Sequence, residues 1–250
     1  MYRVRSTDVW FNLPGVVAAY QPVACPGGPL LARVNVASDQ RTPGRHMATP
    51  GTAPAWSPVT GWGFNGSTQY LNTGISPSAL TWSYLIRYSN LTNTGILCGA
   101  VGFVPSYWEI GIQPSAIYFM NGTYQLSAPG LNAGVLGISD RTGYRNGVAE
   151  ATIGALSLAS SQAIYIGARH NGGISDKYVA ANIQAMAIYR VPIGPWMRQA
   201  SQQMAWCHLN PDWSAWGCRR RYYYAPSAAG FQAAWAARAN RLLGGGADRV

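Results

Sequence analysis

Short segments in which apolar and polar residues alternate place the strongest constraint on how this chain can fold. The clearest is residues 82–89, Trp-Ser-Tyr-Leu-Ile-Arg-Tyr-Ser, in which every second residue is aromatic or isoleucine. A period of two with such residues is typical of a β-strand that buries one face. Further strands are predicted at residues 16–20, 31–36, 107–112, 116–120, 135–139, 141–145, 148–152, 163–167 and 183–189. Many short strands predict an all-β fold.

Turn-forming residues separate these segments. Asn121-Gly122 and Asn146-Gly147 lie between predicted strands, and Asn-Gly is the strongest short hairpin pattern because both residues tolerate positive φ. The chain has 250 residues with 29 glycines and 16 prolines, which suits one large β domain. After the last strand, Pro195 predicts the start of a short helix over residues 196–206, and a second helix is predicted after Ser227.

Three segments, in order along the chain, carry a family resemblance. They are residues 61–71 (GWGFNGSTQYL), residues 141–148 (RTGYRNGV), and residues 164–169 (IYIGAR) followed by 182–190 (NIQAMAIYR). Together they resemble the laminin-G-like group of concanavalin A-like jelly rolls. The resemblance implies an all-β, two-sheet antiparallel jelly-roll sandwich over residues 15–206, preceded by an N-terminal arm at 1–14. We expect residues 207–250 to form an aromatic and arginine-rich extension with a terminal helix.

The scarcity of acidic residues argues against catalysis. Glycanases of this fold class need two carboxyl groups about 5–10 Å apart across the scissile bond, and the family's hydrolases carry such a pair on one strand. Eight acids are present, no two of them closer than ten residues: Asp8, Asp39, Glu109, Asp140, Glu150, Asp176, Asp212 and Asp248. A same-strand pair is therefore impossible, and we expect no enzymatic activity.

The sequence predicts neither a metal site nor a cofactor. The chain has no CxxC pair and no phosphate-binding glycine loop, and its three histidines lie far apart. The acidic positions that the family uses near its calcium ion are Asn65 and Ala185 here. Cys207 and Cys218 are close enough in sequence for a disulfide, but free thiols are the default in a reducing cytoplasm, so both states remain open.

Two segments are candidates for binding glycan. In Tyr107-Trp108-Glu109, an aromatic ring that stacks on a sugar lies beside a carboxylate that accepts hydroxyl hydrogens. The competing interpretation is that Trp108 belongs to the core. The second segment, Arg169-His170-Asn171, begins a polar loop, and loops on rigid sandwiches often carry function. A plain solvated loop is the alternative there.

The extension is a candidate subunit interface, because Trp, Tyr and Arg are enriched at interfaces. The candidate residues are Trp213, Trp216, Arg219, Arg220, Arg221, Tyr222, Tyr223 and Tyr224. Two alternatives remain: the segment folds back over its own sandwich, or it binds single-stranded nucleic acid. We favour docking on a neighbouring subunit over nucleic acid.

Composition favours one function class. Only 10% of residues are charged, the net charge is +10, and Met1 to Arg5 lead into no apolar run typical of a signal peptide. The extension also resembles the ends of bacteriophage virion proteins. We therefore expect a non-catalytic virion structural protein (a capsid decoration, head-fibre or tail accessory protein) made in the host cytoplasm. Its expected partners are capsid or tail subunits in a symmetric assembly or homo-oligomer, and host glycans, with no membrane. A stand-alone carbohydrate-binding module is the alternative.

Overall fold

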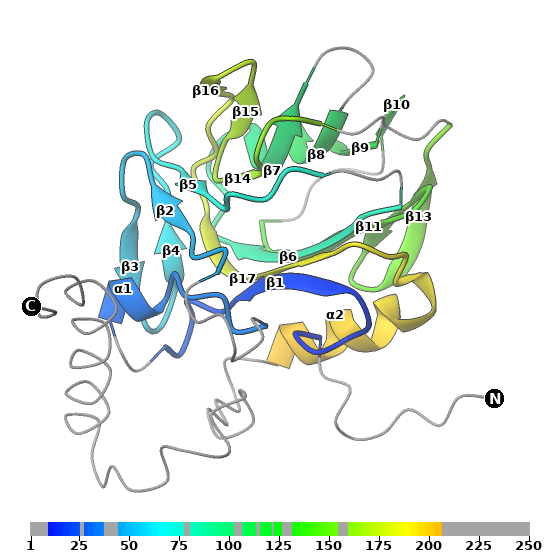
Figure 1. Ribbon diagram of the computed structural model, residues 1–250, viewed down its shortest axis with the longest axis horizontal. Helices are drawn as coiled ribbons and strands as arrows, with labels where there is room; N and C mark the ends of the chain where they lie inside the picture. Colours follow the sequence, from blue (N-terminus) through cyan, green and yellow to red (C-terminus); the bar gives the residue numbers. More distant parts are fainter. Residues whose placement is uncertain are drawn as a thin grey trace, which may run out of the picture.

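Two β-sheets packed face to face form the body of the molecule, which confirms the predicted all-β sandwich (Figure 1). The computed structural model describes residues 10–25, 28–37, 45–77, 81–102, 107–113, 116–121, 123–126, 132–154 and 160–206. Strand pairing is antiparallel except between β15 and β7. In the part of the chain that the structure describes, no helix is long and apolar enough to cross a membrane.

The first sheet follows the order β13-β12-β11-β6-β17-β4-β3, and β1 also pairs with β17. Its central strands are β6 and β17, which pair over almost their whole length. The bounds are β1 Val16–Tyr20, β3 Ala55–Ser57, β4 Gly61–Gly63, β6 Ser83–Ser89, β11 Gly134–Ser139, β12 Thr142–Arg145, β13 Val148–Thr152 and β17 Asn182–Tyr189. Asn146 and Gly147 have positive φ, 50° and 81°, in the turn between β12 and β13, as predicted.

The second sheet follows the order β10-β9-β8-β7-β14-β5-β2. A short hairpin of β15 and β16 joins it at β7 and lies at the top of the molecule in Figure 1. The bounds are β2 Thr49–Pro50, β5 Leu71–Asn72, β7 Gly95–Val101, β8 Tyr107–Gln113, β9 Ala116–Asn121, β10 Thr123–Leu126, β14 Tyr165–Ile166, β15 Arg169–Asn171 and β16 Ile174–Asp176.

The main core lies between the two sheets and is rich in large aromatic side chains. Trp62, Tyr84, Trp108 and Phe119 are almost fully buried in it. The rings of Tyr84 and Trp108 meet edge to face, with centroids 5.9 Å apart, a favourable arrangement for aromatic pairs. Strand alternation then places the neighbours of these residues on the outer faces of the sheets.

A second core covers the outer face of the first sheet. Helix α2 (Met197–Trp206), preceded by the 3₁₀ turn η1 (Gly194–Trp196), lies below β17 and β1 in Figure 1. Its buried residues Met197, Ala200 and Met204 fall on one side, as the sequence predicts, and pack in one cluster with Trp10 and Tyr189. The packed body therefore includes the end of the segment predicted as an N-terminal arm.

The strand predicted at residues 31–36 is wrong. The structure has helix α1 (Gly28–Leu31) there, followed by turns. The Asn35 side chain makes the contacts that a strand would make with its backbone: its Oδ1 accepts from the Ala19 N–H at 2.9 Å, and its Nδ2 donates to the Val17 carbonyl at 3.1 Å. A side chain thus covers the edge of β1 without regular pairing.

Candidate functional site

The hairpin β15–β16 brings Arg169 and Asp176 opposite each other. Its turn consists of Gly172 and Gly173, both with positive φ at 58° and 96°, a two-residue turn that suits the twist of paired strands. Asn171 pairs with Ile174, and the same register pairs Arg169 with Asp176. The glycine turn therefore fixes which acid faces the arginine.

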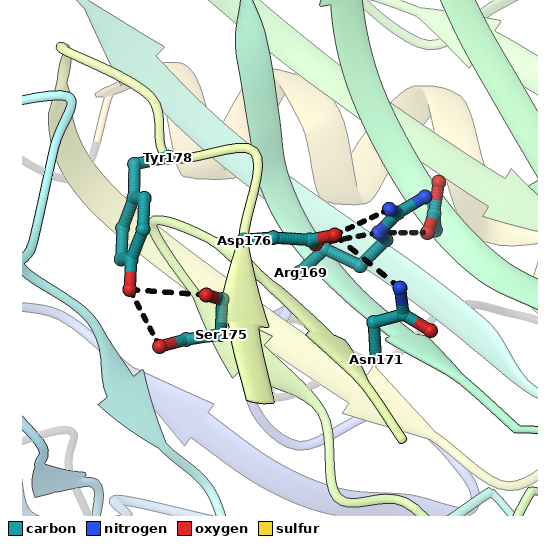
Figure 2. Close-up of polar contacts among 6 residues, drawn as sticks. Arg169, Asn171, Ser175, Asp176 and Tyr178 are labelled. Atoms are coloured by element: carbon teal, nitrogen blue, oxygen red, sulfur yellow. Dashed lines mark hydrogen bonds and ion pairs between the residues drawn. The ribbon is translucent and has the colours of Figure 1, made fainter. Parts of the chain in front are cut away.

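Arg169 holds Asp176 with two hydrogen bonds, as Figure 2 shows. Its Nε donates to Oδ1 at 2.7 Å and its Nη2 to Oδ2 at 2.5 Å, while Asn171 Nδ2 donates to Oδ2 at 3.3 Å. Burial by itself would raise the pKa of Asp176, but the hydrogen bonds from Arg169 and Asn171 outweigh it and the pKa is lowered. The Asp176 side chain stays 30% exposed.

Glu109 lies beneath this hairpin on β8. Trp108 and Ile110 belong to the core, so Glu109, between them, lies on the outer face of the second sheet. Its partner residue on β7 is Gly99, where a Cβ atom would come 3.0 Å from Glu109 Cγ. The absence of a side chain at Gly99 therefore makes room for the carboxyl group.

The Glu109 carboxylate is buried and only partly compensated. It is 1% exposed, and its Oε1 lies 3.6 Å from Arg169 Nε without a hydrogen-bond partner among the described residues. Burial raises its pKa to about 7, against the opposing effect of the charges on Arg169 and Lys177. Glu109 therefore changes its charge near neutral pH.

Two carboxyl groups thus converge on one arginine, which the sequence did not predict. Glu109 Oε1 and Asp176 Oδ1 contact the same Nε atom at 3.6 and 2.7 Å, so they lie no farther apart than the sum of these distances. The absence of a same-strand pair holds, yet the fold joins acids 67 positions apart in sequence. The wide separation of the acids in sequence therefore does not exclude a site that contains two carboxyl groups.

His170 is placed differently from its neighbours in sequence. Its ring stacks on Tyr165 with centroids 4.1 Å apart and planes 6° apart, and Tyr165 stacks in turn on Tyr70 at 4.5 Å. His170 Nδ1 lies 2.9 Å from the Ala163 carbonyl oxygen. His170 is 9% exposed, and its ring contacts place it in this aromatic column rather than in the Arg169 cluster.

The predicted glycan-binding residues therefore lie in four different settings. Glu109, Arg169 and Asn171 come together, and His170 packs in the aromatic column. Trp108 is 0% exposed in the core, so its ring cannot stack on a sugar, and that assignment is corrected. Tyr107 is half-buried at the start of β8, on the same face as Glu109 by alternation.

Asp176 and Lys177 were missed by sequence reasoning. A two-residue Gly-Gly turn between β-type residues predicts a tight hairpin, and Gly172-Gly173 would have paired Arg169 with Asp176. The predicted subunit interface at residues 213–224 and the Cys207–Cys218 pair lie outside the described residues. Among the residues that are described, no group of three or more His, Cys, Asp or Glu side chains is arranged to hold a metal ion.

Comparison with known proteins finds a similar fold but no family to which the chain can be assigned. No family model and no curated protein matches this chain. Among solved structures, it is similar to domain 4 of AbnA, a GH43 extracellular arabinanase from Geobacillus stearothermophilus, solved in complex with arabinotriose. The TM-score is 0.52 at 14% identity, covering 75% of this chain and 98% of that domain. The chain has the fold of a β-sandwich domain.

More distant similarity extends to sialidases. The match to the Trypanosoma rangeli sialidase in complex with sialic acid has a TM-score of 0.47 and 14% identity, over 79% of this chain and 33% of that one. For the K499G mutant of the NanB sialidase from Streptococcus pneumoniae the TM-score is 0.40 at 14% identity, over 53% of this chain and 26% of that one. The chain thus spans about a third of these enzymes or less.

Proposed function

We propose that this chain is a non-catalytic glycan-binding β-sandwich domain that binds sugar at hairpin β15–β16. The observation that carries the proposal is the half-exposed Asp176 carboxylate, which Arg169 and Asn171 hold in place by three hydrogen bonds. Polar groups fixed before binding lose little entropy when a ligand arrives. The fold shared with an arabinanase domain that was solved with arabinotriose supports the same class of ligand.

The arginine between the two acids favours binding over hydrolysis. A glycosidase uses its two carboxyl groups on either side of the glycosidic bond, with sugar or water between them. Here Arg169 contacts both Glu109 and Asp176, so its guanidinium occupies that space and compensates their charges. Glu109 is also shielded from solvent, at 1% exposure.

A glycan array with matched variants tests the proposal. We expect the wild-type protein to bind a defined set of glycans and Asp176→Asn to bind them about tenfold or more weakly, because a hydrogen bond to a charged group contributes about 1.5–3 kcal/mol. Glu150→Gln is the control, since Glu150 is also a carboxylate held by an arginine, Arg145, on the other sheet. Equal loss in both variants, or no binding by the wild type, would contradict the proposal.

The same glycans also test for catalysis. Each glycan bound on the array is incubated with the protein, and new reducing ends are measured. The proposal expects none above the level produced by heat-denatured protein. Release that disappears in both Glu109→Gln and Asp176→Asn would instead identify the converging acids as a hydrolytic pair.

We propose more specifically that the domain acts in a phage virion, bound to capsid or tail subunits in a symmetric assembly. This role rests on sequence: the low charge content and the cluster of Trp, Tyr and Arg at residues 213–224. The protein should sediment with assembled particles, and replacing Arg219, Arg220 and Arg221 by alanine should release it. Normal incorporation of that variant would count against docking through the extension.

A further inference from the structure

The charges and hydrogen bonds at hairpin β15–β16 narrow the ligand class. We infer that the site selects neutral glycans with adjacent hydroxyl groups and discriminates against sialylated, uronate-containing and sulfated ones. This inference rests on the proposed glycan-binding function and deepens it.

The Nε–Nη2 side of the arginine in the site is already occupied. Proteins hold carboxylates and sulfates most effectively with the two-pronged face of an arginine. In Arg169 the prongs are Nε and Nη2, and both donate to Asp176. Nε also lies 3.6 Å from Glu109. An acidic sugar would have to displace Asp176 to reach the same donors.

Within the hydrogen-bonded cluster, the acceptor Asp176 is more exposed than the donor Arg169. The Asp176 side chain is 30% exposed, twice the 15% of the Arg169 side chain. Asn171 uses its Nδ2 to donate to Asp176, which leaves its Oδ1 as an acceptor. Sugar hydroxyls can donate to both oxygens, and two hydroxyls on neighbouring carbons match two acceptors side by side. A carboxylate or sulfate has no hydrogen to donate at neutral pH.

The charge around the hairpin does not favour an anion either. Arg169 and Lys177 supply two positive charges, and Asp176 and ionised Glu109 supply two negative ones. Lys177 is exposed, but its charge lowers the pKa of both Asp176 and Glu109, so an anion near its ammonium group also meets these carboxyl groups. Like charges brought together at a binding site oppose binding strongly.

The hairpin holds these groups rigidly. On the other side of β16 from Arg169, the Tyr178 hydroxyl lies 2.5 Å from Ser175 Oγ and donates to the Ser175 carbonyl at 3.2 Å (Figure 2). These contacts fix the backbone on both sides of Asp176, where Lys177 has a positive φ of 48°. Asp176 is therefore supported from within β16, and turning Arg169 outward for an acidic ligand would break its two hydrogen bonds to Asp176.

The test compares pairs of glycans that differ only in charge. For each neutral glycan bound on the array, calorimetric titration measures its affinity and that of its sialylated or uronate counterpart at physiological salt. We expect the acidic partner to bind about tenfold or more weakly. The net charge of +10 attracts anions non-specifically, which works against this expectation and makes the comparison stringent.

The Asp176→Asn variant tests whether the exposed negative charge causes the preference for neutral glycans. Removing the exposed negative charge should weaken neutral glycans and narrow the gap between the two members of each pair, whereas Glu150→Gln should change neither. Equal or tighter binding of acidic partners by the wild type would overturn the selectivity while leaving glycan binding intact. If neither member of any pair binds, the proposed function itself fails.

Discussion

Glu109 makes the stability of the protein depend on pH near neutrality. Its pKa in the folded state, about 7, lies above its ordinary value of 4.5. Between these values the folded protein holds a proton that the unfolded chain has lost. The stability due to the protonated carboxyl is thus fully present below about pH 4.5 and is lost as pH rises through 7. At 1.36 kcal/mol per pKa unit, the loss is at most about 3 kcal/mol.

Glu109→Gln should remove this dependence. The wild type should lose the stability due to Glu109 as the pH rises from 5 to 8, whereas a neutral amide in the same place does not titrate. The free energy of unfolding of the variant minus that of the wild type should therefore increase from pH 5 to pH 8. Urea unfolding of both proteins at the two pH values measures the difference, and groups shared by the two proteins cancel. If the two proteins show identical changes between pH 5 and pH 8, Glu109 is not buried as an uncompensated carboxylate.

The sequence could predict that Trp108 and Glu109 lie on opposite faces of a strand, but not which of them faces the core. Trp108 and Glu109 are neighbours on a strand, so only one of them can face the core. The sequence left open that Trp108 is the core residue, and the structure selects that alternative. The choice depends on Tyr84 in the facing sheet, a contact between residues 24 positions apart that no local pattern contains.

At the scale of elements, most of the longer strands were predicted, and β7 and several short strands were missed. The bounds of β1 and β13 match the prediction fully, and those of β6, β8, β9, β11 and β17 nearly so. β7 (Gly95–Val101) gave no alternation because six of its seven residues are buried. β3, β4 and β5 are two or three residues long, too short for a periodic pattern.

Two glycines with similar positive φ angles allow the effect of close packing at β4 on stability to be measured. Gly61 begins β4 with φ of 81°, and a Cβ there would lie 2.3 Å from the Ile183 carbonyl oxygen of β17. Gly74 has φ of 65°, with nothing within 4 Å of its Cβ position. Gly74→Ala should cost about 1–2 kcal/mol for the left-handed backbone alone.

Gly61→Ala should cost clearly more, because it adds a backbone clash between β4 and β17 to the same conformational cost. The comparison is the difference in free energy of unfolding between the two variants, measured in denaturant. Equal values would mean that β4 can shift away from β17 without loss, and that its pairing does not fix this corner of the sandwich.

At the scale of the whole molecule, the central strands of the first sheet are covered on both faces, which the sequence did not predict. Trp10 packs in the cluster that includes Met197 and Met204 of α2, and its backbone N–H donates to Gln203 Oε1 at 2.9 Å. These contacts join residues 193 positions apart. The helix pattern indicated an apolar side on α2 but not which surface it covers. The proposed ligand site therefore lies on the outer face of the second sheet, away from the helix that covers the first.

Mapping a bound sugar onto that face tests the central claim directly. In ¹⁵N-labelled protein, a neutral oligosaccharide from the array is titrated while backbone and Asn side-chain amide resonances are followed. The proposed site predicts saturable shifts at Arg169, Asn171, Asp176 and Lys177, with the Asn171 side-chain amide among the most affected and β12–β13 unchanged. Saturable shifts centred on the first sheet, or none on hairpin β15–β16, would contradict the account.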